Sequence, residues 1–152
     1  MSRTDQMRSG HALAFIEGIT DKKRRGAFRQ GIRELPASVR INGLAQAIAM
    51  FQMRAAPRKD ESREKEDAKQ AREGLLDCVR VLGNWLAAKA PDGPELITGE
   101  LLPAMLRCNR VEYYAIQAEV FAYLDWVKTL AVGLIEAPDD DAEREDSSGG
   151  ER

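Results

Sequence analysis

The most distinctive apolar pattern of the chain lies at residues 43–55. Apolar side chains recur there at steps of three and four positions, at Leu44, Ala47, Ile48, Phe51 and Ala55. Alanines and a methionine fill most of the remaining faces. A helix that is apolar on nearly every side is normally buried, so we expect residues 43–55 to form the central helix of the fold.

The residues just before this segment combine a helix signal with a turn signal. Pro36 suits the first turn of a helix, where its fixed φ angle and missing N–H group cost nothing. Asn42-Gly43 then interrupts the pattern, and after the alternating residues 39–41 it leaves a β-hairpin as the alternative. The helical spacing that follows Gly43 favours a helix over the hairpin.

Two further helices are predicted on the N-terminal side. The first covers residues 4–20, and its apolar face contains Met7, His11, Ala14, Phe15, Gly18 and Ile19. The second covers residues 22–34 and directs Phe28, Ile32 and Leu35 toward the core.

Three helices are predicted on the C-terminal side. Residues 57–73 are polar and lead into a helix whose apolar face begins at Leu75 and which ends before Pro91. A short helix follows at residues 100–108, with Pro103 in its first turn. The last predicted helix begins after Asn109, its N-cap, and reaches Ile135. Glu112 can bond back to the open amide groups at its start. The predicted core contains Leu44, Ile48, Phe51, Val79, Leu82, Val120, Leu124 and Val127.

These elements predict an all-α protein, a single small bundle of about six helices. We expect residues 1–137 to form this one domain, with residues 110–135 packed against the central helix. Residues 138–152 carry seven acidic and two basic side chains, and they are predicted to form a disordered acidic tail. No apolar run is long enough to cross a bilayer, and residues 1–10 lack the apolar core of a signal peptide. A cytoplasmic location is therefore expected.

The net charge of −2 conceals an uneven distribution, since residues 1–59 contain 12 Lys/Arg and 4 Asp/Glu. Helical spacing brings four of these cations to one side of the second predicted helix, at Lys22, Arg25, Arg29 and Arg33. Such a basic ridge is either an ordinary solvated face or a surface that follows a phosphate backbone. Both interpretations remain open at this point.

No group of side chains in the sequence has the pattern of a catalytic or metal site. His11 is the only histidine and is interpreted as a packing residue at the core boundary, while Glu73 and Asp77 are expected to be solvated. Cys78 and Cys108 match no zinc or redox spacing and are interpreted as reduced, buried residues. Trp126, at the edge of the last helix and close to Glu119, is either a core residue or an anchor for a neighbouring subunit. We expect no enzymatic activity and no cofactor.

Two blocks of the sequence resemble a known family. Leu35-Pro36 followed by Asn42-Gly43-Leu44-Ala45-Gln46-Ala47-Ile48-Ala49 is the first. The second is Glu119-Val120-Phe121-Ala122-Tyr123-Leu124-Asp125-Trp126-Val127-Lys128-Thr129-Leu130-Ala131. Together, in this order and at this distance, they resemble the small subunit of the Cmr effector complex of type III-B CRISPR systems. The resemblance covers about residues 4–136.

The resemblance implies a non-catalytic ribonucleoprotein subunit that acts in antiviral defence. Several copies would stack head to tail beside the guide RNA and its backbone subunits, line the channel for single-stranded target RNA and bridge toward the large subunit. Two positions depart from the family pattern: Thr129 stands where a second basic residue often follows Lys128, and Phe28 replaces a common tyrosine. A free-standing helical adaptor or regulator that binds a protein partner is the alternative. The candidate RNA-binding residues are Lys22, Arg25, Arg29 and Arg33, with Arg40, Arg54 and Lys128 as lesser candidates, and Trp126 is the candidate subunit contact.

Overall fold

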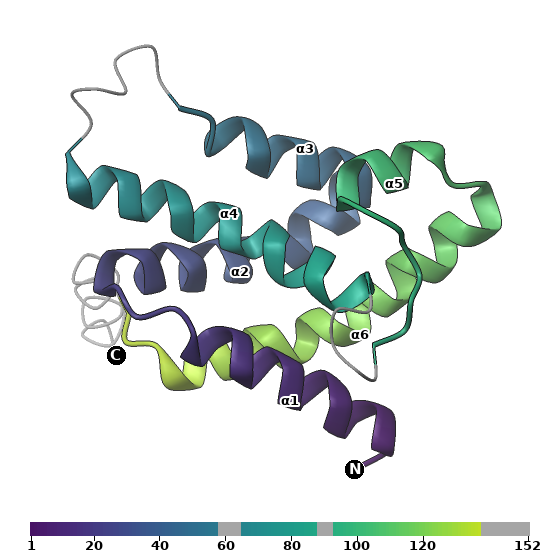
Figure 1. Ribbon diagram of the computed structural model, residues 1–152, viewed down its shortest axis with the longest axis horizontal. Helices are drawn as coiled ribbons and strands as arrows, with labels where there is room; N and C mark the ends of the chain where they lie inside the picture. Colours follow the sequence, from purple (N-terminus) through teal and green to yellow (C-terminus); the bar gives the residue numbers. More distant parts are fainter. Residues whose placement is uncertain (58–64, 88–92, 138–152) are drawn as a thin grey trace, which may run out of the picture.

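The structure is a computed structural model that describes residues 1–57, 65–87 and 93–137. Within these ranges it contains six helices and no strand, so the predicted all-α fold is confirmed (Figure 1). The helices are α1 (Arg3–Glu17), α2 (Lys22–Asn42), α3 (Leu44–Arg54), α4 (Glu66–Leu86), α5 (Leu101–Arg107) and α6 (Arg110–Leu134). The predicted disordered tail at residues 138–152 lies outside the described residues. No helix in the described part of the chain is both long and apolar enough to cross a membrane.

The centre of the fold is the α2–α4 pair, which makes the most extensive contact between any two helices. The two backbones approach closely at a glycine, because a Cβ atom on Gly74 would lie 2.3 Å from the carbonyl oxygen of Arg24. The same Cβ would lie 2.8 Å from the Cβ of Ala27. Gly31 on α2 has a similar role, since its Cβ would meet the sulfur of Cys78 at 2.7 Å. Only glycine fits at these two contact points.

The prediction that residues 43–55 form the central helix is therefore wrong in its placement. The segment is helical as α3, and Leu44, Ile48 and Phe51 are buried. However, α3 covers α2, α4 and α5 from one side, and Met50 and Met53 on its outer face are exposed. An alanine-rich helix has low polarity on every face, and this composition does not indicate how many of those faces are covered.

The second predicted helix continues through Pro36 instead of ending at Glu34. Proline cannot donate to the carbonyl four residues earlier, which usually ends or kinks a helix. Here Leu35, Pro36 and Val39 are all buried, and this burial offsets the missing hydrogen bond. The helix ends at the predicted interruption, where Gly43 has a φ angle of 81°.

Helix α6 runs antiparallel to α2 and also packs against α1. At one end the hydroxyl of Tyr113 accepts a hydrogen bond from the amide of Ala45 at 3.1 Å. Further along, the guanidinium of Arg40 lies 5.6 Å from the centre of the Phe121 ring. The predicted packing of residues 110–135 against residues 43–55 is therefore wrong for most of α6, whose extensive contacts are with α1 and α2 and whose hydrogen bond to α3 is made at Tyr113.

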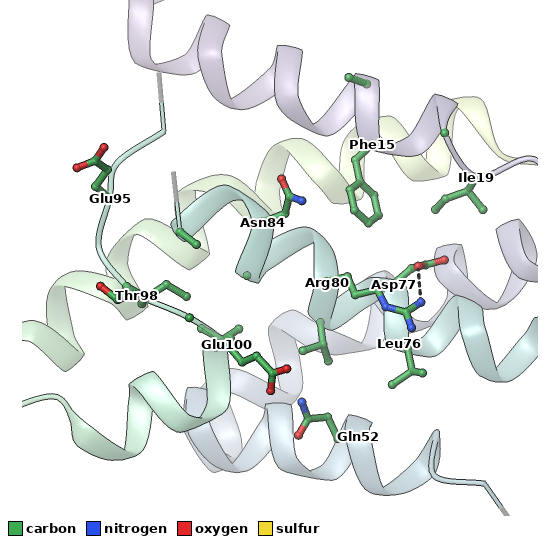
Figure 2. Close-up of a pocket in the computed structure, with 18 of the residues that line it drawn as sticks. Phe15, Ile19, Gln52, Leu76, Asp77, Arg80, Asn84, Glu95, Thr98 and Glu100 are labelled. Carbon is green, nitrogen blue, oxygen red and sulfur yellow. Dashed lines mark hydrogen bonds and ion pairs between the residues drawn. The ribbon is translucent and has the colours of Figure 1, made fainter. Parts of the chain in front are cut away.

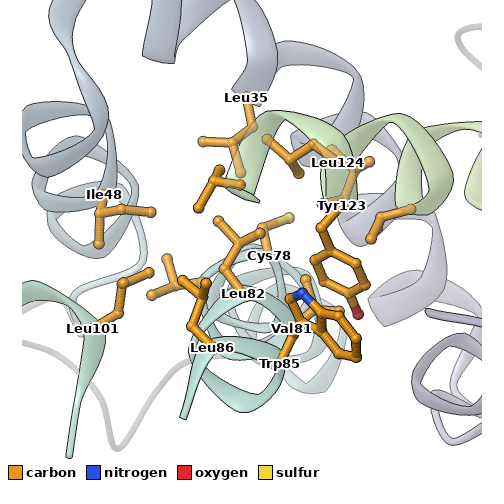
Figure 3. Packing of buried hydrophobic residues seen from close by; sticks show 14 of the residues in the cluster. Leu35, Ile48, Cys78, Val81, Leu82, Trp85, Leu86, Leu101, Tyr123 and Leu124 are labelled. Carbon is orange, nitrogen blue, oxygen red and sulfur yellow. The ribbon is translucent and has the colours of Figure 1, made fainter. Parts of the chain in front are cut away.

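Local signals predicted the start of α6 and the position of α5, whereas α1 ends at Glu17, three residues before its predicted end. The capping box is present, with the amide of Glu112 donating to Asn109 at 2.9 Å and the amide of Asn109 donating to Glu112 at 3.1 Å. Pro103 lies in the first turn of α5, as predicted. All of the predicted core residues are buried, and Figure 3 shows how Leu82 and Leu86 of α4 lie between side chains from α3, α5 and α6.

Candidate functional site

The structure does not expose the predicted basic ridge of α2 as one surface. Lys22 and Arg33 are exposed, but Arg25 is half-buried. The Arg25 guanidinium donates to the carbonyl oxygen of Ile16 at 2.9 Å and also to that of Ile19, so it closes the end of α1. This arginine is therefore part of the connection between α1 and α2.

Arg29 is only 5% exposed, which corrects its predicted position on a surface ridge. Its Nε and Nη1 atoms are covered and have no hydrogen-bond acceptor among the residues that the structure describes. Helical spacing places Arg25 and Arg29 at the flank of the apolar stripe, and it cannot show whether a neighbouring helix covers that flank. Here the flank is covered.

A different set of cations shares a face formed by α2 and α6. Arg40 of α2 lies over Phe121 of α6. Arg33 lies seven residues, or nearly two full turns, before Arg40 on α2. Lys128 lies the same number of residues after Phe121 on α6. Because the helices are antiparallel, both steps run about 10 Å in the same direction. Arg33, Arg40 and Lys128 are all exposed, and we call this surface the α2–α6 basic face.

Arg54 does not belong to this face. Its guanidinium pairs with the carboxylate of Glu34 at 3.0 Å and lies 5.2 Å from the centre of the Phe51 ring. Both charged side chains are more than two fifths exposed, so the pair contributes little to stability. It does neutralise the charge of Arg54 locally.

A polar cluster joins α1, α4 and α6 on the other side of the fold. Arg8 donates two hydrogen bonds to Glu119, at 2.9 and 2.8 Å, and the indole of Trp85 donates to the same carboxylate at 3.0 Å. His11, half-buried as expected, bonds to the hydroxyl of Tyr123 and, at 3.0 Å, to Asn84. These contacts fix the side of α1 that faces α4 and α6.

Trp126, the candidate subunit contact, is half-buried beside this cluster. Its indole N–H donates to the carboxylate of Asp5 on α1 at 3.2 Å. The indole that bonds to Glu119 is that of Trp85, from α4, whereas the indole of Trp126 holds the first turn of α1 against α6. The part of the Trp126 ring that remains accessible is the part that could meet another subunit.

The polar cluster predicts a specific dependence of stability on pH. Burial raises the pKa of Glu119, but the hydrogen bonds from Arg8 and Trp85 together outweigh it, so this pKa lies below the ordinary value of 4.5. A carboxyl group whose pKa is lower in the folded state stabilises the fold above its unfolded pKa. That contribution is lost as the pH falls through the folded-state pKa.

We therefore expect the melting temperature to fall as the pH drops below about 4.5, and Glu119→Gln to remove part of that dependence. Thermal melts of both proteins between about pH 3 and pH 7 measure the difference. Glu17→Gln, at an exposed carboxyl on α1, is the control and should leave the pH profile unchanged. Parallel profiles for Glu119→Gln and the unaltered protein would contradict the expectation.

One cleft described by the structure has a volume of about 1070 Å³ and lies between α1, α4 and residues 95–101 (Figure 2). Its wall contains Asp77, which is 1% exposed and receives two hydrogen bonds from Arg24, at 2.6 and 2.9 Å. Arg80 adds a bond to Asp77 at 3.1 Å and one to Glu73 at 2.7 Å. The expectation that Glu73 and Asp77 are solvated is therefore wrong for Asp77.

In the wall of the cleft Asp77 is thus paired with Arg24 and Arg80. The hydrogen bond from Arg80 holds the pKa of Glu73 below its ordinary value, despite partial burial. Cys78, on the buried side of α4, is fully buried as predicted, and burial raises the pKa of its thiol. Cys108 is half-buried, less than predicted. The Arg24–Asp77 pair and Cys78, which bonds to the Phe28 carbonyl oxygen, serve the packing of α2 against α4.

Comparison with known proteins identifies the family. No curated protein matches this chain. The family model described as CRISPR-associated protein (Cas_Cmr5) matches residues 4–134, which is most of the chain and spans all six helices from α1 to α6. Together with the all-helical fold, this match shows that the chain belongs to the Cas_Cmr5 family, the small subunit of the type III-B CRISPR Cmr complex.

Proposed function

We propose that this protein is a non-catalytic subunit of the Cmr complex that binds single-stranded target RNA through the α2–α6 basic face. The observation that carries the proposal is the convergence of Arg33, Arg40 and Lys128, from two helices, on one exposed surface. None of the three has an ion-pair partner among residues 1–57, 65–87 and 93–137. Their charge is available to an external anion.

The face suits a phosphate backbone better than a base edge. Arg40 is held over the Phe121 ring, which limits its freedom before binding and lowers the entropy cost of a contact. Contacts between cations and phosphates carry no sequence information. A subunit that must accept any target sequence selected by the guide RNA requires this kind of contact.

Repetition of the subunit would strengthen a weak contact. One copy offers three cations, and its affinity for RNA should be low and strongly dependent on salt. Copies stacked head to tail along the complex would present several such faces to one strand, and linked sites raise the overall affinity through their effective concentration. We therefore place the main RNA contribution in the assembled complex, with Trp126 near one of the subunit contacts.

The test is a triple charge reversal, Arg33→Glu, Arg40→Glu and Lys128→Glu, in the assembled complex. We expect target-RNA affinity to fall at least about tenfold at low salt, because the attraction between these side chains and phosphates becomes repulsion. The slope of log affinity against log salt should decrease by up to about 0.7 for each cation–phosphate pair removed per copy. Filter binding across a salt series measures both quantities.

A matched control reverses the same number of charges away from the face, at Arg3, Arg107 and Arg110, which are all exposed. This control should leave RNA affinity close to that of the unaltered complex. If the complex with the altered α2–α6 basic face assembles normally and both its affinity and its salt slope are unchanged, the face is an ordinary solvated surface.

A further inference from the structure

The covered guanidinium of Arg29 has an unmet requirement for an anion. A buried charge without a partner is costly, and proteins normally pair such groups or give them hydrogen bonds. Nε and Nη1 of Arg29 have neither among the described residues, and the residue is only 5% exposed. The nearby carboxylate of Asp77 already accepts from Arg24, and the carbonyl oxygens of Ile16 and Ile19 accept from Arg25. These acceptors therefore serve other arginines.

The antiparallel register of α2 and α6 locates Arg29 near the end of α6. Arg29 lies eleven residues before Arg40 on α2, and Val132 lies eleven residues after Phe121 on α6, so both lie about 16 Å from the Arg40–Phe121 contact. Helix α6 ends two residues later, at Leu134. Figure 1 agrees, since the yellow end of α6 lies beside the first turns of α2.

The first turns of α2 present further cations at this end of the fold. Lys22 and Lys23 are both exposed. Acidic described residues also lie at this end of the fold. Asp21 caps α2 by accepting from the Arg24 amide at 3.0 Å, Glu73 accepts from Arg80, and Glu17 and Glu136 are exposed. We call Lys22, Lys23 and Arg29 the α2 anion site.

The sequence that leaves α6 at this point has the complementary charge. Residues 139–146 contain six carboxylates and one arginine, a net charge of −5. We propose that this acidic segment is the occupant of the α2 anion site and that one of its carboxylates pairs with Arg29. Only a few residues separate Leu134 from Asp139, and such a short linker gives an effective concentration in the millimolar range.

The proposal is tested with the acidic segment supplied in trans. A chain ending at Ala137 and a labelled peptide of residues 138–152 are mixed, and fluorescence anisotropy measures binding. We expect the shortened chain to bind the peptide with an affinity that falls as salt increases. The full chain, whose site is already occupied, should bind it at least about tenfold more weakly, because the tethered segment competes.

Two variants of the shortened chain identify the site. Arg29→Met keeps the length of the side chain and removes the unpaired charge, so it should fold and should lose at least about tenfold in peptide affinity. Lys22→Gln with Lys23→Gln changes only exposed side chains and should also weaken binding. Arg107→Gln, at an exposed position on α5, and a peptide with all carboxyls changed to amides are the controls for nonspecific charge.

Three results would overturn the proposal: no peptide binding by the shortened chain, equal binding by the full and shortened chains, or full binding after the α2 changes. The lysine variant keeps the test decisive if Arg29→Met does not fold. No RNA is present in this measurement, so its failure is distinguishable from a failure of the proposed RNA-binding function.

Discussion

Gly74→Ala should lower the free energy of unfolding by about 3 kcal/mol or more, since overpacking a close contact costs about 1 to 3 kcal/mol when the neighbours can adjust. Here they adjust poorly. The added Cβ would lie 2.3 Å from the carbonyl oxygen of Arg24 and 3.0 Å from the amide nitrogen of Phe28, which are both backbone atoms of α2. The α2–α4 pair must therefore separate, and the packing around it weakens as a whole.

Gly10→Ala is the matched control, because Gly10 also lies inside a helix and a Cβ there would meet no heavy atom within 4 Å. Removing a helical glycine at an open position stabilises a protein by up to about 1 kcal/mol. Urea denaturation of both variants should therefore give changes of opposite sign. Similar changes in the two variants would mean that α2 and α4 are not in close contact at Gly74.

Arg24→Met should lower the free energy of unfolding by about 3 kcal/mol, because removing one partner of a buried pair leaves an uncompensated charge. The carboxylate left behind belongs to Asp77, whose side chain is 2% exposed. Arg80 remains as a partner, but its side chain is 47% exposed and it is shared with Glu73. Asp77 cannot move to solvent without moving α4.

Two comparisons separate this effect from the general removal of a surface charge. Arg54→Met breaks the exposed pair with Glu34 and should cost less than about 1 kcal/mol. Combining Arg24→Met with Asp77→Leu removes both charges of the pair, including the buried carboxylate, and should recover part of the stability. Equal costs for Arg24→Met and Arg54→Met in chemical denaturation would show that Asp77 gains its stability from other groups.

The sequence predicted those parts of the fold whose signals lie within a few residues. The cap at Asn109 and Glu112, the turn at Gly43 and the position of Pro103 are all properties of one helical turn. Pro36 shows where this local reasoning fails. A proline inside a helix is unfavourable locally, and the burial of Leu35 and Val39 against other helices, which compensates for it, is not visible in neighbouring residues.

The candidate site was less predictable because its properties depend on distant residues. The burial of Asp77 rests on Arg24, 53 positions earlier, and the coverage of Arg29 rests on packing around α2. Helical periodicity correctly placed the α2 cations in their directions around the helix axis. The neighbouring helices decide which of those side chains are exposed to water. The α2–α6 basic face required the pairing of Arg40 with Phe121, which links two helices that are remote in the sequence.

The Tyr113 hydroxyl, which accepts a hydrogen bond from the Ala45 amide, also determines when α3 can be completed during synthesis of the chain. Gly43 offers no side chain to cap α3, and a helix of 11 residues is marginal when isolated in water. The hydroxyl that caps α3 belongs to a residue 68 positions later in the chain. A ribosome that adds about 5 to 20 residues per second needs about 3 to 14 s to synthesise those positions. During that interval Leu44, Ile48 and Phe51 have no completed core to enter, so we expect the nascent chain to present this segment to chaperones until α6 emerges.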